Sequence, residues 1–293
     1  MVNDNVDVFE FDQVTKELLS FFQARGWVQA YGQNRRSIMA ACEDPKTMAT
    51  YNYSGTVWPL PQTNQMHLEH FLLDHLQKNP SFGAGMVCQT TSYRQEPNPV
   101  DGRHNLIFPM FEFEACGTME DLLQLEGDLL RHLGYSATDN NCLHEQSISG
   151  YPEFDYEYLS DKYNVHELDH SHETRMLDDY GHAAFIKNFP EHTYPFWNMA
   201  RKDGTARKVD VILSGIETIG SAERSCDVEQ MRRNFYNISD GKYAERLFSE
   251  FTKERVVKEL DDFLAKDFKP RFGGGIGVTR LIRSLKLLRG GSM

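Results

Sequence analysis

The sequence predicts an α+β domain in which helices flank a mainly antiparallel sheet. Its strand-like runs come in neighbouring pairs joined by turn-like connectors, and they do not alternate regularly with helices. The chain has 293 residues, of which 40% are hydrophobic and 25% charged, a composition typical of a globular protein with a sizeable core. No internal repeat, low-complexity tract or Pro/Ser-rich linker divides it, so we expect a single domain over residues 1–293.

Several segments show the apolar spacing of amphipathic helices. In residues 12–25, Val14, Leu18 and Phe22 share one face, and Gly26 ends the helix. The other helices are expected at 68–78, at 119–133 with a broad leucine face, at 248–266, which holds one helix or two, and at 279–288.

Strand-like runs lie between these helices. They are expected at 85–94, 107–117, 209–215 and 272–278. The first two flank the stretch YRQEPNPVDGRH, which has the composition of a long hairpin loop. By contrast, residues 136–192 are polar and irregular, and rich in Asp, Glu, His and Tyr. We expect that segment to form an insertion or a lid.

Composition argues against several classes of protein. The formal net charge is −12, so the surface as a whole should repel nucleic acid. The five cysteines are odd in number and form no CxxC pair, which is typical of reduced thiols rather than of a disulfide framework or a zinc ribbon. The acidic N-terminus lacks the apolar region of a signal peptide, and no run is long enough to cross a membrane. We therefore expect a cytoplasmic protein with no membrane partner.

A run of glycines precedes the last predicted helix. Gly273, Gly274 and Gly275 are consecutive, Gly277 follows, and Arg280 lies in the first turn of the helix. The segment is neither a Walker loop nor a GxGxxG dinucleotide fingerprint. A strand without side chains offers a floor for a flat ligand, on which an arginine can stack or pair with phosphate. The alternative is a tight packing contact between strand and helix.

A second group of charged residues surrounds the predicted hairpin loop. The first strand of the hairpin ends with Arg94 and Glu96. The second strand follows the loop and begins with Arg103, His104 and Phe108. This pattern resembles motif 2 of the class II aminoacyl-tRNA synthetases, and GGGIGVTR resembles motif 3 of the same family. The resemblance implies the class II fold, an antiparallel sheet flanked by helices.

Further segments resemble the aspartyl/asparaginyl branch of that family, over about residues 17–288. By this resemblance Asp210 and Glu217 match two magnesium-binding carboxylates. The positions that match contacts to the amino acid are Glu43, Gln65 in PLPQTNQ, Glu112, Ser221 and Arg224. YPFWNM, residues 194–199, also resembles this branch.

The resemblance implies an ATP- and Mg²⁺-dependent adenylation of a carboxylate, with Arg94 and Arg280 as catalytic residues. Arg94 would clamp the α-phosphate and the carboxylate, while Phe108 and Arg280 sandwich the adenine. Glu96 would accept from the adenine amino group, and Arg103 or His104 would reach the outer phosphates. Gly275 and Gly277 would complete the ATP site.

The pair Asp210 and Glu217 sets a geometric condition. On one strand, positions seven apart face opposite sides of a sheet. A turn or bulge near Ser214 and Gly215 is therefore needed to bring both carboxylates to one Mg²⁺ ion.

The overall pattern also resembles asparagine synthetase A, in the archaeal type related to asparaginyl-tRNA synthetase. That resemblance implies a homodimer that converts L-aspartate, ammonia and ATP to asparagine, AMP and pyrophosphate. Three features depart from the synthetases: no anticodon-binding domain accompanies the core, Gln33 replaces the motif 1 proline, and Leu68 replaces a lysine that neutralises the substrate's side-chain carboxylate. Arg224, or Lys46 from the neighbouring loop, would take over that task.

Other functions remain open from the residues alone. The activated acyl group could pass to a tRNA, a protein or a small amine, and we expect tRNA to be an unlikely acceptor because the chain is acidic and lacks a tRNA-binding domain. A non-catalytic paralogue acting as a binding subunit is a further alternative. His166, Glu167 and His170 satisfy HExxH, which on a helix would form a zinc hydrolase site.

Overall fold

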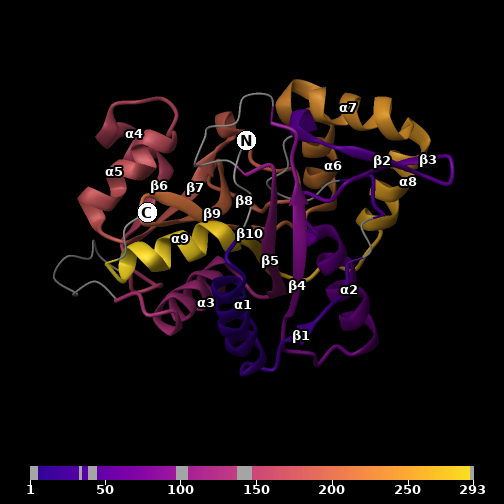
Figure 1. The fold of residues 1–293 in the computed structure, drawn as a ribbon. Coiled ribbons are helices and arrows are strands. Elements are labelled where there is room, and N and C mark those ends of the chain that lie inside the picture. The colour runs from indigo at the N-terminus through magenta and orange to yellow at the C-terminus, as the bar shows by residue number, and fades with distance from the viewer. Residues whose placement is uncertain (1–5, 33–34, 39–44, 97–104, 137–146, 291–293) are drawn as a thin grey trace.

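In the computed structural model, which describes residues 6–32, 35–38, 45–96, 105–136 and 147–290, helices cover both faces of a central sheet (Figure 1). Within the described residues this sheet has nine strands in the order β1-β4-β5-β11-β10-β9-β7-β6, and β8 adds to β9. The strands are β1 (Val28–Gln29), β4 (Met86–Tyr93), β5 (Ile107–Cys116), β6 (Glu153–Asp155), β7 (Ala183–Pro190), β8 (Arg201–Lys202), β9 (Thr205–Leu213), β10 (Ile216–Arg224) and β11 (Arg271–Gly277). A separate hairpin joins β2 (Thr50–Tyr53) to β3 (Thr56–Pro59).

Most neighbouring strands of the large sheet run antiparallel. In the part of the chain that the structure describes, only β1 with β4 and β6 with β7 are parallel, and both pairs lie at the sheet edges. The predicted α+β class with a mainly antiparallel sheet is therefore confirmed. The sheet is also discontinuous in sequence, because β11 lies between β5 and β10.

Three helices cover one face of the sheet: α1 (Val8–Gln23), α3 (Met119–His132) and α9 (Val278–Leu288). Their apolar residues join those of the strands in the largest core cluster, in which Phe22 of α1 stacks on Phe111 and Phe113 of β5. Local sequence fixes where the helices begin. Asp7 accepts hydrogen bonds from the first free N–H groups of α1, and Thr118 and α3 share a capping box.

The other helices lie on the opposite face, in two groups. The first consists of α2 (Gln65–Lys78), α6 (Val228–Asn237), α7 (Lys242–Phe251) and α8 (Lys253–Leu264), and the second of α4 (Tyr156–Tyr163) and α5 (His170–Tyr180). Each group has its own apolar clusters against the sheet. Between the groups, the middle strands β5, β10 and β9 contribute side chains to an open cavity, and β11 contributes Gly275 and Gly277.

The expectation for residues 136–192 was wrong in one respect. Beyond residues 137–146, which lie outside the described part, the segment is regular and contains β6, α4, α5 and β7. Strand β7 pairs with β9, and Phe185 is buried in the main core. The polar residues that suggested irregularity lie mostly on the exposed sides of α4 and α5, while β6 and β7 are strands of the main sheet.

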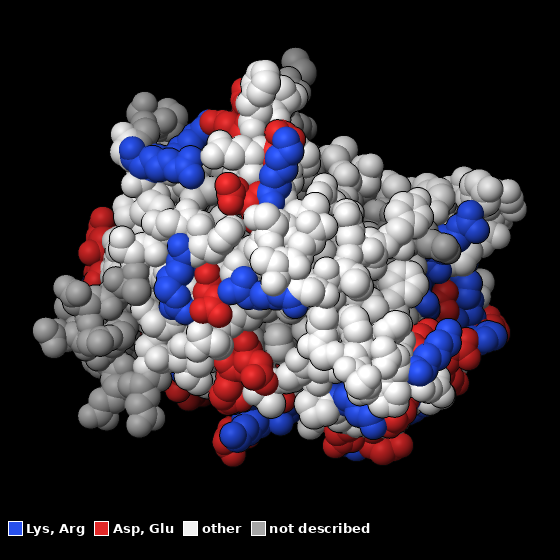
Figure 2. All heavy atoms as spheres, turned by 90° about the horizontal axis from the view of Figure 1, so that it is seen from below, with Lys and Arg blue, Asp and Glu red and all other residues white. Residues whose placement is uncertain are grey.

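The underside of Figure 1, where α1, α3 and β1 lie, faces the viewer in Figure 2. On this side Lys and Arg are interspersed with Asp and Glu, so the acidic excess does not form one large patch there. Exposed apolar residues occur on α1 and β1, namely Val8, Phe9 and Val28, with Tyr31 just beyond β1. Within the described part of the chain, no helix is both long and apolar enough to cross a membrane.

The glycines of β11 are required by the approach of the neighbouring strands. A Cβ at Gly274 would lie 2.6 Å from the Ser221 Cβ and 2.8 Å from Cζ of Phe113. A Cβ at Gly273 would overlap the Glu114 carboxylate. The packing interpretation of the glycine run therefore applies to these two residues. Gly275 instead faces the cavity.

A carboxylic acid is buried in the helix layer behind the sheet. Glu126 of α3 is 1% exposed, and neither of its carboxyl oxygens has a hydrogen-bond partner among the described residues. Burial raises the pKa of Glu126 to about 8, and the nearby Ser221 hydroxyl opposes the rise. The side chain is therefore protonated at neutral pH.

We predict that Gly274→Ala lowers the free energy of unfolding by about 1–3 kcal/mol, because the new methyl group has no space between β5 and β10. Gly83→Ala is the matched control, since a Cβ there meets nothing within 4 Å. Urea unfolding of the two variants measures the difference. Equal midpoints for both would contradict this account of the glycine strand.

We predict that wild-type stability falls with pH between about 4.5 and 8 partly because of Glu126. Its pKa is raised from 4.5 in the unfolded chain to about 8, so the folded state binds more protons in this window. The stability from its protonation is present below pH 4.5 and is lost as pH rises through 8. In Glu126→Gln that slope, up to about 1.4 kcal/mol per pH unit, disappears. Urea unfolding across the window tests this, and parallel curves for both proteins would refute it.

Candidate functional site

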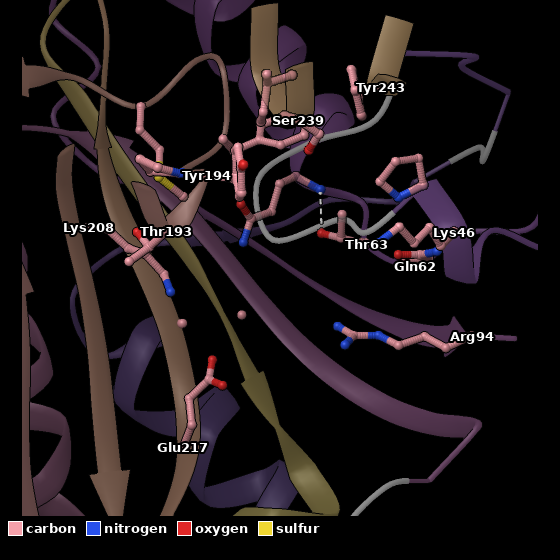
Figure 3. A pocket seen from close by; sticks show the side chains of 18 of the residues that line it. Lys46, Gln62, Thr63, Arg94, Thr193, Tyr194, Lys208, Glu217, Ser239 and Tyr243 are labelled. Carbon is pink, nitrogen blue, oxygen red and sulfur yellow. Dashed lines mark hydrogen bonds between the residues drawn. The ribbon is translucent and has the colours of Figure 1, made fainter. Parts of the chain in front are cut away.

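A cavity of about 980 Å³ opens on the sheet face between the two helix groups (Figure 3). A volume of this size accommodates a nucleotide together with a second small molecule. The cavity brings together eight of the residues that the sequence predicted for a site: Lys46, Gln65, Arg94, Phe108, Glu217, Gly275, Gly277 and Arg280.

The floor of the cavity is the bare backbone of β11. A Cβ at Gly275 would lie 2.6 Å from the Met110 Cε, so a side chain there would displace the end of the Met110 side chain and cover the floor. Helix α9 follows directly, and its first turn carries Arg280. Nη1 of Arg280 donates a 2.7 Å hydrogen bond to the backbone oxygen of Glu217, which holds the guanidinium beside β10.

Arg94 and Phe108 come from the two strands next to this floor. Phe108 pairs with Ser92 across β4 and β5, and Arg94 follows directly after β4 on the same face. The backbone N–H of Arg94 donates to the Leu106 oxygen at 2.8 Å. Its guanidinium carbon lies 5.4 Å from the Phe108 ring centroid, and its Nε is buried with no hydrogen-bond partner among the described residues. Arg94 therefore presents an unused donor beside an aromatic face.

Glu112, which the resemblance assigned to the amino acid, lies beneath the loop that leads to Gln65. It is fully buried and does not line the cavity. Its carboxylate accepts hydrogen bonds from the Thr63 hydroxyl and, at 2.9 Å, from the Asn64 N–H at the start of α2. Glu112 thus fixes the loop that precedes Gln65 rather than facing a ligand itself.

Arg224 belongs to a buried cluster of four charges behind the cavity. Its Nη2 donates to Gln65 at 2.5 Å and lies 3.3 Å from the Glu114 carboxylate. Glu69 accepts from Arg271 at 2.8 Å and lies 3.8 Å from Nε of Arg224. The side chains of all four charged residues are fully buried, with 0% exposure. The structure therefore does not bring Arg224 to the cavity surface.

This cluster sets the orientation of Gln65. The Gln65 oxygen must face Arg224, because a guanidinium group only donates hydrogen bonds. Its amide nitrogen consequently lies on the side of Gly275, where a Cβ would be 3.7 Å away. Gln65 thus offers donors to an oxygen in the cavity.

Ser221 is not brought to the cavity either. It pairs with Val209 of β9 and with Gly274 of β11, so its side chain lies on the face covered by α1, α3 and α9. Its hydroxyl donates to the Val209 oxygen at 3.3 Å, near Glu126. The neighbouring Ala222 faces the other side.

Asp210 and Glu217 lie on the same face of the sheet. They stand on β9 and β10, which a two-residue turn at Ser214 and Gly215 connects, both with positive φ. The pairing of β10 with β9 shifts its register between Glu217 and Ile219. The sequence analysis required a turn or bulge near Ser214 and Gly215 between the two carboxylates, and the hairpin turn at these residues meets that requirement.

The residues around Asp210 fit a magnesium ion held jointly with a ligand. Its Oδ1 is buried without a hydrogen-bond partner among the described residues, which leaves one acceptor open. Burial raises the pKa of Asp210, Glu217 adds to the rise, and Lys208 opposes it. Within the described residues no three His, Cys, Asp or Glu side chains could hold a metal together. Mg²⁺ commonly uses one or two carboxylates and takes its other ligands from phosphate and water.

The cavity is more basic than the sequence suggested. Its described lining includes Lys46, Arg94, Lys208, Lys242, Arg246 and Arg280, against only Asp240 and Glu217 as acids. Of those that the sequence reasoning did not assign, Lys208 had a usable signal. It stands two positions before Asp210, directly before the predicted strand 209–215, and in an extended chain such a position shares the face of Asp210. Lys242 and Arg246 had none, because α7 is far from the motifs in sequence.

Backbone strain also gathers at the cavity. Tyr194, Ser239 and Asp240 line it with φ values of 52°, 55° and 56°. Left-handed non-glycine residues cost of order 1–3 kcal/mol each and persist where the surrounding structure holds them. The strained residues of this cavity are thus the first residue of the segment 194–199 and two residues of the segment 238–241.

Several predicted residues fall elsewhere. Glu43, Arg103, His104 and Gln33 lie outside the described residues. Glu96 follows β4 but is not part of the cavity lining. The zinc-site alternative fails on geometry within the described part: residues 164–169 form a bend rather than a helix, so His166 and His170 do not share a helix face, and His166 stacks on His192 instead.

Comparisons with known proteins agree with this arrangement. The family described as tRNA synthetases class II (D, K and N) matches residues 45–288, while no curated protein matches the chain. The sheet and its helices resemble asparaginyl-tRNA synthetase from Pyrococcus horikoshii complexed with asparaginyl-adenylate, with a TM-score of 0.71 at 17% identity over 95% of this chain and 65% of that one.

Two further solved structures are similar. The asparaginyl-tRNA synthetase of Entamoeba histolytica in complex with asparaginyl-adenylate has a TM-score of 0.68 at 16% identity, over 95% of this chain and 63% of that one. A putative aspartyl-tRNA synthetase from Leishmania major Friedlin has a TM-score of 0.71 at 14% identity, over 95% of this chain and 62% of that one. This chain thus spans less than two thirds of each of these chains. At these identities the likeness shows the fold, and the family match shows descent: the chain belongs to the class II tRNA synthetases of the D, K and N branch.

Proposed function

We propose that this protein activates the carboxylate of L-aspartate with ATP and Mg²⁺, releasing pyrophosphate, and passes the acyl group from the adenylate to ammonia. One observation carries the proposal. Arg94 and Phe108 face Glu217 and Arg280 across the glycine floor of a single basic cavity. Adenylation requires fixed cations around the phosphates and a flat surface for the base, and this arrangement supplies both.

Each side chain has a task that its position supports. Arg94 donates to the α-phosphate and to the carboxylate under attack, since its Nε has no partner among the described residues. Phe108 stacks on the adenine, and Arg280 covers the other side. Asp210 and Glu217 hold Mg²⁺, which neutralises charge on the phosphates. Lys242 and Arg246, at the start of α7, reach toward the outer phosphates.

Recognition of the amino acid falls to Gln65 and Lys46. Gln65 presents its amide donors over the floor, and Lys46 lines the cavity. Leu68 is 1% exposed within an apolar cluster, and Arg224 is enclosed in the four-charge cluster. Of the two cations considered for the substrate's second carboxylate, the placement favours Lys46 over Arg224.

The acceptor is the open part of the proposal. The relatives with the same fold are tRNA synthetases by name, which gives no support to the expectation that tRNA is an unlikely acceptor. Transfer to tRNA, to a protein or to a small amine therefore stands as the second candidate. A cytoplasmic homodimer remains a prediction, and the exposed apolar residues of α1 and β1 favour an interface there.

We predict that the wild-type protein forms AMP and pyrophosphate from ATP only with Mg²⁺, L-aspartate and ammonium together, with asparagine appearing in equal amount. Arg94→Ala should reduce the rate by about 10²–10³-fold, and Arg280→Ala comparably, because each removes a cation from the developing charge. Arg175→Ala is the control, since this arginine is exposed on α5 outside the cavity. Coupled AMP release and product analysis provide the measurement.

The other outcomes discriminate between candidates. AMP formation with aspartate but without a response to ammonium would indicate another acceptor, and added tRNA or small amines would then identify it. If no amino acid supports AMP formation, the binding-subunit alternative becomes the leading hypothesis. Full activity of Arg94→Ala would contradict the assignment of the site.

A further inference from the structure

Lys208 lies in the cavity beside the two carboxylates proposed to hold magnesium. It stands on β9 on the same sheet face as Asp210, and its Nζ lies 2.7 Å from the Asp210 Oδ2. The ammonium group is also 4.0 Å from the centroid of the Phe189 ring, which restricts where it can go. Figure 3 shows the side chains of Lys208 and Glu217 pointing toward one another in the cavity.

The chain places cations of its own beside these carboxylates. The Glu173 carboxylate is also close, since it accepts a hydrogen bond from the Glu217 N–H at 3.0 Å and acts on Asp210. Asp210 and Glu217 each have one cation as a neighbour. Lys208 contacts the first, and Nη1 of Arg280 lies 3.8 Å from the second. A divalent cation that arrived alone would meet an ammonium at one of its two carboxylates and would be repelled by both cations.

We propose that Lys208 is an internal counter-ion of the Asp210–Glu217 pair, which suppresses the binding of free divalent metal and restricts the site to metal that arrives with a triphosphate. The proposal rests on the proposed function for its assignment of the two carboxylates. When the nucleotide enters, its phosphate oxygens offer the ammonium new partners, and Asp210 becomes available to the ion. Lys208 is thus a positioning residue that selects the metal–nucleotide complex over the free metal.

The alternative is an ordinary structural ion pair. Two observations favour the counter-ion role. Lys208 is part of the cavity lining, whereas a purely structural partner has no reason to face a ligand space. In addition, only one oxygen of Asp210 is engaged by Lys208, and the other is buried without a partner among the described residues. Oδ1 of Asp210 is therefore available as an acceptor for a ligand that is not part of the chain.

The test is the binding of Mn²⁺ alone to the protein without nucleotide, measured by electron paramagnetic resonance of the free ion. We predict weak binding by the wild type and at least tenfold tighter binding by Lys208→Met, because one repelling charge is removed while both carboxylates remain. Lys208→Arg keeps the charge and should bind as weakly as the wild type. Lys202→Met is the matched control, since it removes one positive charge from an exposed position on β8 outside the cavity.

A second substitution locates the effect. Glu217→Gln added to Lys208→Met should abolish the gain in Mn²⁺ affinity. Circular dichroism checks the fold of each variant, and Lys208→Gln, which can still hydrogen-bond to Asp210, replaces the Met variant if that one does not fold. A change of less than twofold in the variant that folds, or an equal gain in Lys202→Met, would overturn the proposal.

This experiment does not depend on catalysis. If Lys208→Met gains Mn²⁺ affinity while no AMP is ever formed, the counter-ion role stands and the proposed reaction fails. If AMP formation requires magnesium as proposed but the variant binds Mn²⁺ no better than the wild type, the counter-ion role alone is refuted.

Discussion

The buried cluster of Glu69, Glu114, Arg224 and Arg271 is the interaction on which the rest of the structure depends. It joins α2, β5, β10 and β11, and Asn198 completes it by donating to Glu69 at 2.7 Å. Four charges in an apolar interior are tolerable only as a set, because removal of one leaves another buried without compensation, at about 3–5 kcal/mol. The cluster also orients Gln65, so the same contacts that fasten a helix to the sheet prepare one wall of the cavity.

The cavity contrasts with the molecule that contains it. The chain carries a net charge of −12, yet the charged residues that line the described part of the cavity are predominantly basic. Cations gathered in a cleft with low-dielectric walls focus their field, which raises the local concentration of an anionic ligand although the protein as a whole repels it. Net charge therefore predicts poorly what such a protein binds, and the position of Lys208 or Arg246 matters more than the total.

Sequence reasoning succeeded where local rules decide. The strands expected at 107–117 and 272–278 are present as β5 and β11. Arg94, Glu217 and Arg280, which the family resemblance assigned to one site, line the same cavity. It failed where the outcome depends on partners distant in sequence. Ser221 faces the helix layer because of its register with Val209, and Arg224 is enclosed because Glu69 and Glu114 reach it from other elements. The sequence from β6 to β7 suggested an irregular segment because the many polar residues of α4 and α5 outnumber the apolar residues of the buried strand β7.

The place of β11 in the sheet has a consequence for how the protein is made. In the finished sheet its Arg271 pairs with Cys116 of β5 on one side and with Arg224 of β10 on the other. A ribosome releases β5, β9 and β10 well before β11, so the two halves of the sheet emerge with unpaired inner edges. Such edges are prone to mispairing with other chains. The nascent chain therefore relies on a late, glycine-rich strand to close its sheet, and the cavity floor forms only when that strand is in place.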